Sequence, residues 1–243
     1  MPQITRFIDD RNNFHVLLCG LIFFLGADAV VVQFQLKGTQ QAINITLMIV
    51  LIVNVWAIDN PRTDVISWKL GATMAIALTM ITDSLIVSNF LAKFQLIMAF
   101  IFISLTTWQA WSQVMFTGRV DQNKIVGAVC IYLLLGMAWA FAYLIVEAFL
   151  PGSMNGLESD LWQENVHGLI YYSMVTLTTL GYGDITPNQP LVRFLAYMEA
   201  VTGVFYMAIL VASLIGIRLA GVDPTKSIEE LEAEDRARRS ANS

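Results

Sequence analysis

Long apolar runs separated by short polar segments make up most of this chain of 243 residues. Most of the runs have about the 17 to 25 residues that a helix needs to cross a bilayer core. The segments between them hold charged residues, Asn and Pro, which are typical of loops. The pattern predicts six membrane-spanning helices, over residues 14–36, 43–58, 67–89, 93–116, 125–150 and 191–219.

Lys and Arg are unevenly divided between the two sets of loops. If both termini are cytoplasmic, eleven of these residues lie on the cytoplasmic side and three lie outside, at Lys37, Lys93 and Arg193. Cytoplasmic loops of membrane proteins carry an excess of Lys and Arg. We therefore expect a multi-pass protein of the plasma (cell inner) membrane with both termini in the cytoplasm.

Composition excludes several classes of protein. Hydrophobic residues are 56% and charged residues 14% of the chain, whereas soluble domains have about 25% charged residues. The net charge of -5 argues against nucleic acid as a partner. Cys19 and Cys130 both fall inside apolar runs, where we expect buried free thiols. His15 and His167 are too few and too separated for a metal cluster or a catalytic triad, and we expect no enzyme.

A weakly polar segment lies between the fifth and sixth apolar runs. Residues 165–177 read as a helix of about 20 Å, too short to cross a core of about 30 Å, so this helix is expected to be re-entrant. Asn165 is its expected N-cap, with Glu164 near its positive end. The sequence Thr-Thr-Leu-Gly-Tyr-Gly-Asp follows at 178–184. A Gly-rich turn is the simplest interpretation.

The two glycines around one aromatic residue also allow a second interpretation of this segment. Gly181 and Gly183 flank Tyr182, and Gly accepts positive φ readily, so consecutive backbone carbonyls can be turned to one side. A row of such oxygens can replace the water around a cation.

The sequence Thr-Leu-Gly-Tyr-Gly-Asp at 179–184 resembles the selectivity filter of the potassium channel superfamily, with Leu where the commonest form has Val. The resemblance implies a homotetramer around one axis, with K⁺ as the bound ion. It implies K⁺ sites formed by the carbonyls of Thr179, Leu180, Gly181 and Tyr182 and by the Thr179 hydroxyl, within a filter that ends at Gly183.

Other residues are expected to support this filter. Thr178 precedes it and Asp184 follows it. In the family an acidic residue at the position of Asp184 bonds an aromatic side chain of the pore helix, and Tyr171 and Tyr172 occupy that region here, where Trp is more common.

Glu199 lies inside the last apolar run, where an ionisable group is expensive and marks a functional position. We expect it to face the re-entrant helix, with Ser173 or Thr176 as its partner, and to steady the filter.

Gly203 lies nineteen residues beyond Asp184, where the resemblance implies a hinge in the inner helix. Close packing against a neighbouring helix is the alternative. Positions four apart from Gly203 form one stripe of the helix. The stripe consists of Met207, Val211, Ile215 and Leu219. We expect it to line the cavity, with an apolar gate at Ile215 or Leu219.

The first four runs resemble the peripheral domain of voltage-gated-like channels in topology alone. A voltage sensor needs several basic residues in the fourth run, and Lys93 is the one present there. We therefore expect no steep voltage dependence. Asp28 and Asp83 are expected near Lys93 in the outer half of the membrane, either as a structural charge pair or as a proton-sensitive or cation-binding cluster.

No Lys or Arg occurs between Lys124 and Arg193. The acidic residues of this stretch are expected to surround the outer mouth with negative charge, although an ordinary solvated loop is the alternative. They are Glu147, Glu158, Asp160, Glu164 and Asp184.

The expected fold is an all-α membrane protein with six transmembrane helices, a re-entrant pore helix and a tetrameric pore. Its expected parts are a cytoplasmic N-terminus (1–13), a four-helix peripheral domain (14–120), a pore domain (125–221) and a cytoplasmic tail (222–243). The expected function is passive, potassium-selective conduction across the lipid bilayer. The alternatives are a weakly selective cation channel, a transporter subunit and a non-conducting regulatory subunit.

Overall fold

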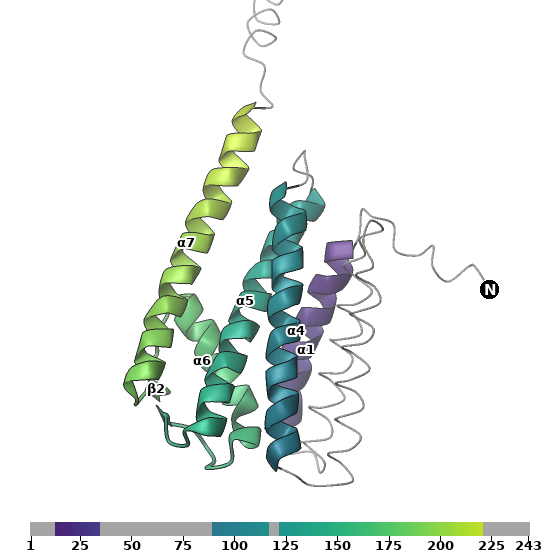
Figure 1. Cartoon of the computed structure of the whole chain (residues 1–243). Coiled ribbons are helices and arrows are strands. Elements are labelled where there is room, and N and C mark those ends of the chain that lie inside the picture. Colours follow the sequence, from purple (N-terminus) through teal and green to yellow (C-terminus); the bar gives the residue numbers. More distant parts are fainter. Residues whose placement is uncertain (1–12, 35–88, 117–121, 221–243) are drawn as a thin grey trace, which may run out of the picture. The chain divides into compact units, whose positions relative to one another are not determined.

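The computed structural model describes residues 13–34, 89–116 and 122–220 (Figure 1). The second and third predicted spans, except Asn89, lie outside these residues together with Asp83, and so does the tail at 222–243. The described part contains the following elements: α1 (Asn13–Gln33), α4 (Asn89–Phe116), α5 (Gln122–Phe149), β1 (Met154–Asn155), the 3-10 helix η1 (Trp162–Asn165), α6 (Val166–Leu177), β2 (Thr186–Pro187) and α7 (Pro190–Ala220).

Within the described residues, three helices are long and apolar enough to cross a membrane. The qualifying stretches are Asn89–Val114, Asn123–Phe149 and Pro190–Ser213, and α1 contributes a shorter apolar stretch, Phe14–Ala27. The predicted spans at 93–116, 125–150 and 191–219 thus correspond to α4, α5 and α7, with α4 beginning four residues earlier than predicted. The fold is mostly helical, and six spans stay a prediction.

Helix α5 lies at the centre of the first part of the fold, where it contacts α1, α4 and α6. Small residues are buried along it, among them Ala128 and Ala140. Gly136 allows the Met174 side chain of α6 to lie directly on its backbone. Between apolar helices in a bilayer, association depends on close packing and interhelical hydrogen bonds. The sequence of α5 therefore allows three other helices to approach it.

The two cysteines differ in environment. Cys130 of α5 is buried, and its thiol donates to the Phe14 carbonyl of α1 at 3.4 Å. Cys19 is free but exposed, so the expectation that both thiols are buried was wrong for Cys19. An apolar run alone does not tell which face of a helix packs inward.

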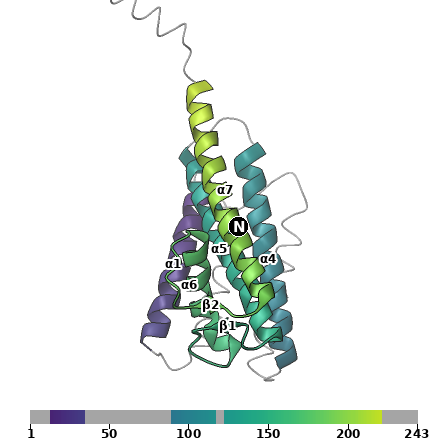
Figure 2. The ribbon, with the colours of Figure 1, turned by 90° about the vertical axis from the view of Figure 1, so that its left-hand side faces the viewer.

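Two short strands are an addition to the all-α prediction. β1 follows α5 and pairs antiparallel with β2, which follows the 178–184 segment; Met154 lies opposite Pro187 and Asn155 opposite Thr186. Figure 2 shows the two strands side by side. Strands of two residues have no periodic pattern, and so hydropathy could not predict them.

The chain divides into two compact units, Met1–Tyr206 and Met207–Ser243, and α7 runs through the boundary. The predicted division into peripheral and pore domains stays a prediction. Within the first unit, the Tyr206 hydroxyl of α7 donates to the Ala128 carbonyl of α5 at 2.5 Å, and the centre of its ring lies 5.8 Å from that of Trp111 of α4.

Candidate functional site

The helix α6 begins at Val166 and ends at Leu177, so its bounds differ by one residue from those of the predicted re-entrant helix at 165–177. Asn165 has the N-cap position, but its side chain makes no capping bond. Its amide instead donates to the Ser159 carbonyl at 2.6 Å, and its side-chain oxygen accepts from the Ser159 N–H at 3.2 Å. The predicted capping bond was wrong because the backbone of Asn165, at φ -93° and ψ 8°, continues the preceding 3-10 turn and lacks the extended conformation of a capping residue.

The backbone after α6 alternates in handedness. Positive φ angles occur at Thr179 (60°), Gly181 (59°) and Gly183 (80°), and there are no cis peptide bonds among the described residues. The two glycines were the basis of the sequence prediction. Thr179 was missed, because a β-branched residue disfavours this region and gives no signal for it. A non-Gly residue held there costs about 1–3 kcal/mol and persists where its surroundings fix it.

Three consecutive N–H groups of this segment point at the end of α6. The Thr179 N–H donates to Thr176 at 2.9 Å, and those of Leu180 and Gly181 donate to Val175 at 2.9 and 3.3 Å. In a trans peptide the N–H and the C=O of the same unit point in opposite directions. The carbonyls that precede these N–H groups, those of Thr178, Thr179 and Leu180, therefore point away from α6. Three backbone oxygens are left free of helical partners on one side of the segment.

Thr178 differs from its neighbour in the chain. Its hydroxyl donates back to the Met174 carbonyl at 2.8 Å, and its N–H donates to the same oxygen at 3.1 Å. Thr178 thus closes the last turn of α6, and its hydroxyl is directed toward the helix.

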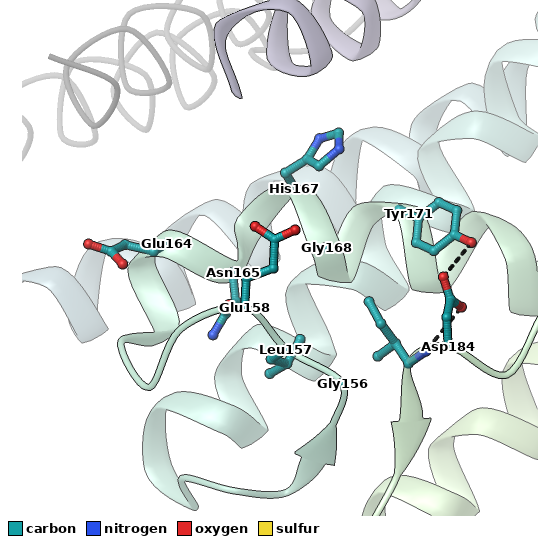
Figure 3. Close-up of a pocket in the computed structure, with 10 residues that line it drawn as sticks. Gly156, Leu157, Glu158, Glu164, Asn165, His167, Gly168, Tyr171 and Asp184 are labelled. Atoms are coloured by element: carbon teal, nitrogen blue, oxygen red, sulfur yellow. Dashed lines mark hydrogen bonds between the residues drawn. The ribbon is translucent and has the colours of Figure 1, made fainter. Parts of the chain in front are cut away.

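Asp184 is held by one of its two predicted aromatic partners (Figure 3). The Tyr171 hydroxyl donates to its carboxylate at 2.7 Å, and the Ile185 N–H donates to the other oxygen at 3.0 Å. The bond from Tyr171 lowers the pKa of Asp184 below its ordinary value and raises the pKa of Tyr171. Tyr172 is not a partner of Asp184: it is buried, and its ring packs edge-on against Tyr143 of α5 at 5.1 Å.

A cavity of about 320 Å³ lies beside Asp184, and Glu158, His167 and Tyr171 are among its lining residues (Figure 3). Glu158, Asp160, Glu164 and Asp184 are exposed. Glu147 is buried, so its predicted place among the solvent-facing acidic residues was wrong. In the part of the chain that the structure describes, no three His, Cys, Asp or Glu side chains are grouped to hold a metal ion.

Glu199 of α7 is completely buried between α5 and α6. Its carboxylate accepts from the Tyr143 hydroxyl at 2.6 Å and from the Ser173 hydroxyl at 2.5 Å. The predicted partner Ser173 is thereby confirmed. Tyr143 was not predicted, because nothing in the sequence relates α5 to the position of Glu199. The Ser173 hydroxyl also lies 2.6 Å from the Gly136 carbonyl, so one side chain of α6 links the two long helices.

Gly203 lies directly on the end of α6. A Cβ atom built on it would be 2.1 Å from the Leu177 carbonyl oxygen, an oxygen that also accepts from the Tyr132 hydroxyl at 3.1 Å. This contact favours the alternative of close packing, while the hinge stays a prediction.

The predicted cavity stripe does not share one environment. Gly203 is buried, whereas Met207 and Val211 are exposed. Burial along α7 instead follows Val192, Glu199 and Tyr206 at seven-residue intervals, which is one face of a helix. The side chains of Ile215 and Leu219 lie outside the described part, so the gate stays a prediction.

Lys93 contacts an aromatic ring in the described part of the chain. Its ammonium lies 4.9 Å from the centre of the Phe149 ring, a cation–π contact that joins α4 to the end of α5. The side chain of Asp28 lies outside the described part, as does Asp83, and the cluster of the three residues stays a prediction.

The amino-acid sequence is similar to sequences of known channel proteins. Residues 127–218 match a family described as ion channel. Over 81 residues the chain is 35% identical to the two-pore potassium channel 3 of Arabidopsis thaliana, a match that covers 31% of this chain and 18% of the relative. Over 96 residues it is 30% identical to the voltage-gated potassium channel of Aeropyrum pernix, covering 40% of this chain and 29% of the relative.

No solved structure matches the chain significantly. The chain spans less than a third of the length of each of these relatives. The family match at residues 127–218 contains α6, the 178–184 segment and most of α5 and α7. The chain is thus similar to the ion channel family over residues 127–218, and both of these relatives are potassium channels.

Proposed function

We propose that the chain is one subunit of a homotetrameric channel that conducts K⁺ passively and selectively through a filter of backbone carbonyls. The filter consists of Thr179, Leu180, Gly181, Tyr182 and Gly183. The carbonyls of the first four residues and the Thr179 hydroxyl coordinate K⁺ in place of water. The ion crosses the membrane down its electrochemical gradient, and no reaction is catalysed.

The observation that carries this proposal is the row of N–H groups bonded to α6. It turns the Thr179 and Leu180 carbonyls away from the helix. Positive φ at Thr179, Gly181 and Gly183 alternates with ordinary φ, which suits successive carbonyls that share one side. One strand of this kind cannot surround an ion, so the proposal requires several copies around an axis.

Exposure of the filter side chains supports a tetramer. In a single chain, Leu180 is 56% and Tyr182 67% exposed. Exposed apolar side chains beside a polar backbone are typical of a surface that another protein covers. The neighbouring subunits of a tetramer would cover them, and the acidic residues near the filter would attract cations to the outer mouth.

We assign supporting roles to residues around the filter. Asp184, held by Tyr171, fixes its outer end, and Glu199, held by Ser173, fixes the pore helix behind it. The cavity and gate are assigned to α7 beyond Gly203, at Met207, Val211, Ile215 and Leu219.

The channel is not steeply voltage-gated. Helix α4, the fourth predicted span, contains Lys93 as its single basic residue. Steep opening requires several charges per subunit to move through the membrane field, and one Lys at the beginning of α4 does not supply them.

Purified protein in liposomes tests the proposal. We expect a reversal potential that follows the K⁺ gradient in mixed K⁺ and Na⁺, and a particle that contains four chains of 27.1 kDa. Gly181→Ala forces a side chain onto a residue with φ 59° and should abolish K⁺ selectivity. Gly26→Ala is the control. A Cβ atom added there would meet no atom within 4 Å beyond its own stretch of helix, so this variant should conduct like the parent.

Two of the alternatives have their own outcomes in this assay. Equal permeation of K⁺ and Na⁺ would indicate the weakly selective channel. An assembled tetramer without flux would indicate a regulatory subunit. A protein that remains monomeric in the bilayer would contradict the proposal.

A further inference from the structure

Four oxygen-bearing groups form a closed cluster where α5, α6 and α7 meet. The Tyr143 hydroxyl lies 2.6 Å from Oε2 of Glu199, and the Ser173 hydroxyl lies 2.5 Å from Oε1 of Glu199 and 2.6 Å from the Gly136 carbonyl oxygen. The three side chains are 0% exposed. Buried polar groups are paired with one another when surface water does not reach them. We call these four groups the buried cluster.

The number of hydrogens in the buried cluster depends on the charge of Glu199. Two oxygens 2.5–2.6 Å apart have the spacing of an O–H···O bond, which requires a hydrogen between them. If Glu199 is ionised, Tyr143 and Ser173 supply one hydrogen each, whereas the cluster has three such contacts. The single hydrogen of Ser173 then serves either Glu199 or the Gly136 carbonyl. The contact left over brings two acceptor oxygens together, which repel each other.

A proton on Glu199 supplies the third hydrogen. Glu199 then donates to the Ser173 oxygen, Ser173 donates to the Gly136 carbonyl, and Tyr143 donates to the other Glu199 oxygen. The bond between Ser173 and Glu199 thus has the reverse of its direction in the ionised form. Each short contact contains one hydrogen, and no charge is buried among the three helices.

Glu147 shows that burial alone does not require a proton. It is 6% exposed, and its carboxylate accepts from the backbone N–H groups of Gly152 and Met154 at 2.7 and 3.2 Å and from the Ser153 hydroxyl at 2.6 Å. Each of these donors brings its own hydrogen, so an ionised carboxylate satisfies them all. Glu199 differs because the hydrogen of its serine partner has a second acceptor within reach.

The titratable groups that face Glu199 are phenols. Tyr132 and Tyr143 of α5 and Tyr172 of α6 interact with it electrostatically, and phenols are neutral up to about pH 10. The charged residues and the histidine of the three helices lie near helix ends: Lys124, Glu147, His167, Arg193 and Arg218. The neighbours of Glu199 thus leave its charge to be decided by the buried cluster itself.

We propose that Glu199 carries a proton in the conducting channel and that loss of this proton at alkaline pH makes the channel stop conducting. The second half of this inference rests on the proposed function. When a base in the solvent takes the proton, the ionised carboxylate claims the Ser173 hydrogen, and the Gly136 carbonyl loses its donor. The hydrogen bond between α5 and α6 is then broken, and α6 leads directly into the proposed filter.

Infrared spectroscopy of the purified protein in a bilayer tests the first half. A protonated carboxylic acid has a carbonyl stretching band distinct from that of a carboxylate. We expect such a band at neutral pH, its loss at alkaline pH, and its absence from Glu199→Gln at every pH. Glu158→Gln removes an exposed carboxyl group outside the buried cluster and should keep the band. A band of equal size in the parent and in Glu199→Gln would overturn the inference.

K⁺ flux from liposomes against pH tests the second half. Flux of the parent should fall reversibly by about tenfold at alkaline pH, the equivalent of roughly one hydrogen bond. Glu199→Gln should lack this fall, because its amide cannot lose a proton in this range and donates at the same place. Glu158→Gln should fall like the parent. An equal alkaline fall in the parent and in Glu199→Gln, or a constant flux in the parent, would overturn the switch.

Tyr143→Phe is the second variant and serves whether or not Glu199→Gln assembles. It removes one donor from Glu199, and a donor favours the ionised form more than the neutral form. Loss of the infrared band and loss of flux should therefore move together to higher pH. A shift of one without the other, or no shift of either, would overturn the inference. A parent without K⁺ selectivity would contradict the proposed function instead, and the infrared band would still report the proton on Glu199.

Discussion

Asp184, which follows the proposed filter, shows how one hydroxyl decides the environment of a side chain. Two adjacent tyrosines stood in the region from which a partner was expected, and α6 directs them to different places. Tyr171 bonds Asp184 on the exposed side, whereas Tyr172 is buried against Tyr143. Adjacent helical residues lie about 100° apart around the axis, so both could not face the same carboxylate.

Tyr171→Phe should make the filter more sensitive to acid. The bond from Tyr171 lowers the pKa of Asp184, so its stabilising effect is present above the ordinary pKa of an aspartate and is lost as pH falls through the lowered value. Without the hydroxyl the pKa of Asp184 returns toward its ordinary value. The midpoint of acid inactivation, measured as K⁺ flux against external pH, should move to higher pH.

Asp160→Asn removes an exposed carboxylate outside this hydrogen bond and serves as the control, with a midpoint close to that of the parent. A Tyr171→Phe midpoint at or below the parent value would contradict the brace between Tyr171 and Asp184.

Glu199→Gln and Glu199→Val should differ sharply. An amide both accepts and donates, so Gln can accept from the Tyr143 hydroxyl and donate to the Ser173 oxygen. The single hydrogen of the Ser173 hydroxyl can then be donated to the Gly136 carbonyl, which is also within reach. Val leaves the buried Tyr143 hydroxyl without its acceptor, at a cost of about 1–3 kcal/mol, and it removes the link from Ser173 to α7. We expect assembled, conducting channels for Gln and loss of thermal stability and flux for Val.

The measurement is the melting temperature of the purified tetramer together with K⁺ flux. Similar behaviour of the two variants would show that the hydrogen bonds of Glu199 do not support α6.

At the scale of whole elements, the apolar runs predicted α1, α4, α5 and α7 to within a few residues. Length and hydropathy determine a membrane helix almost by themselves. The finer elements escaped prediction. The 3-10 helix η1 has four residues and the strands β1 and β2 have two each, which is too short for a periodic pattern. The two strands also pair residues that lie far apart in the sequence. Glu147 was misplaced for the same reason, since its partners come from a loop without a hydropathy signal.

Gly203→Ala tests the contact between α7 and α6. The added methyl group would be 2.1 Å from the Leu177 carbonyl oxygen, and a backbone oxygen cannot move aside as a flexible side chain does. Overpacking of this kind costs about 1–3 kcal/mol or more. We expect a less stable tetramer and lower K⁺ selectivity, because the displaced end of α6 leads directly into the proposed filter.

A channel with altered opening but unchanged stability and selectivity would instead favour the hinge at Gly203. The two outcomes are separated by recording thermal stability, reversal potential and the open fraction from the same preparation.

For the whole molecule, the sequence predicted the pore segment better than its surroundings. The positive φ of Gly181 and Gly183 and the bond between Glu199 and Ser173 followed from local sequence and from the cost of a charge in a membrane. Thr179 did not, because its positive φ is imposed by hydrogen bonds to α6 rather than by its own preference. Contacts from α5 also could not be predicted, since hydropathy gives no rotation of one helix against another.

Those contacts from α5 come from one face of the helix. Tyr132 donates to the end of α6, the Gly136 carbonyl accepts from Ser173, Tyr143 donates to Glu199, and the Glu147 carboxylate accepts from the Ser153 hydroxyl. The four positions are separated by four, seven and four residues and lie on one stripe of the helix. One face of α5 thus holds several points along the proposed pore segment. A point substitution would remove one of these contacts. Inserting one residue at the middle of α5 would instead rotate every contact beyond the insertion by about 100° and misalign the two ends of the proposed filter.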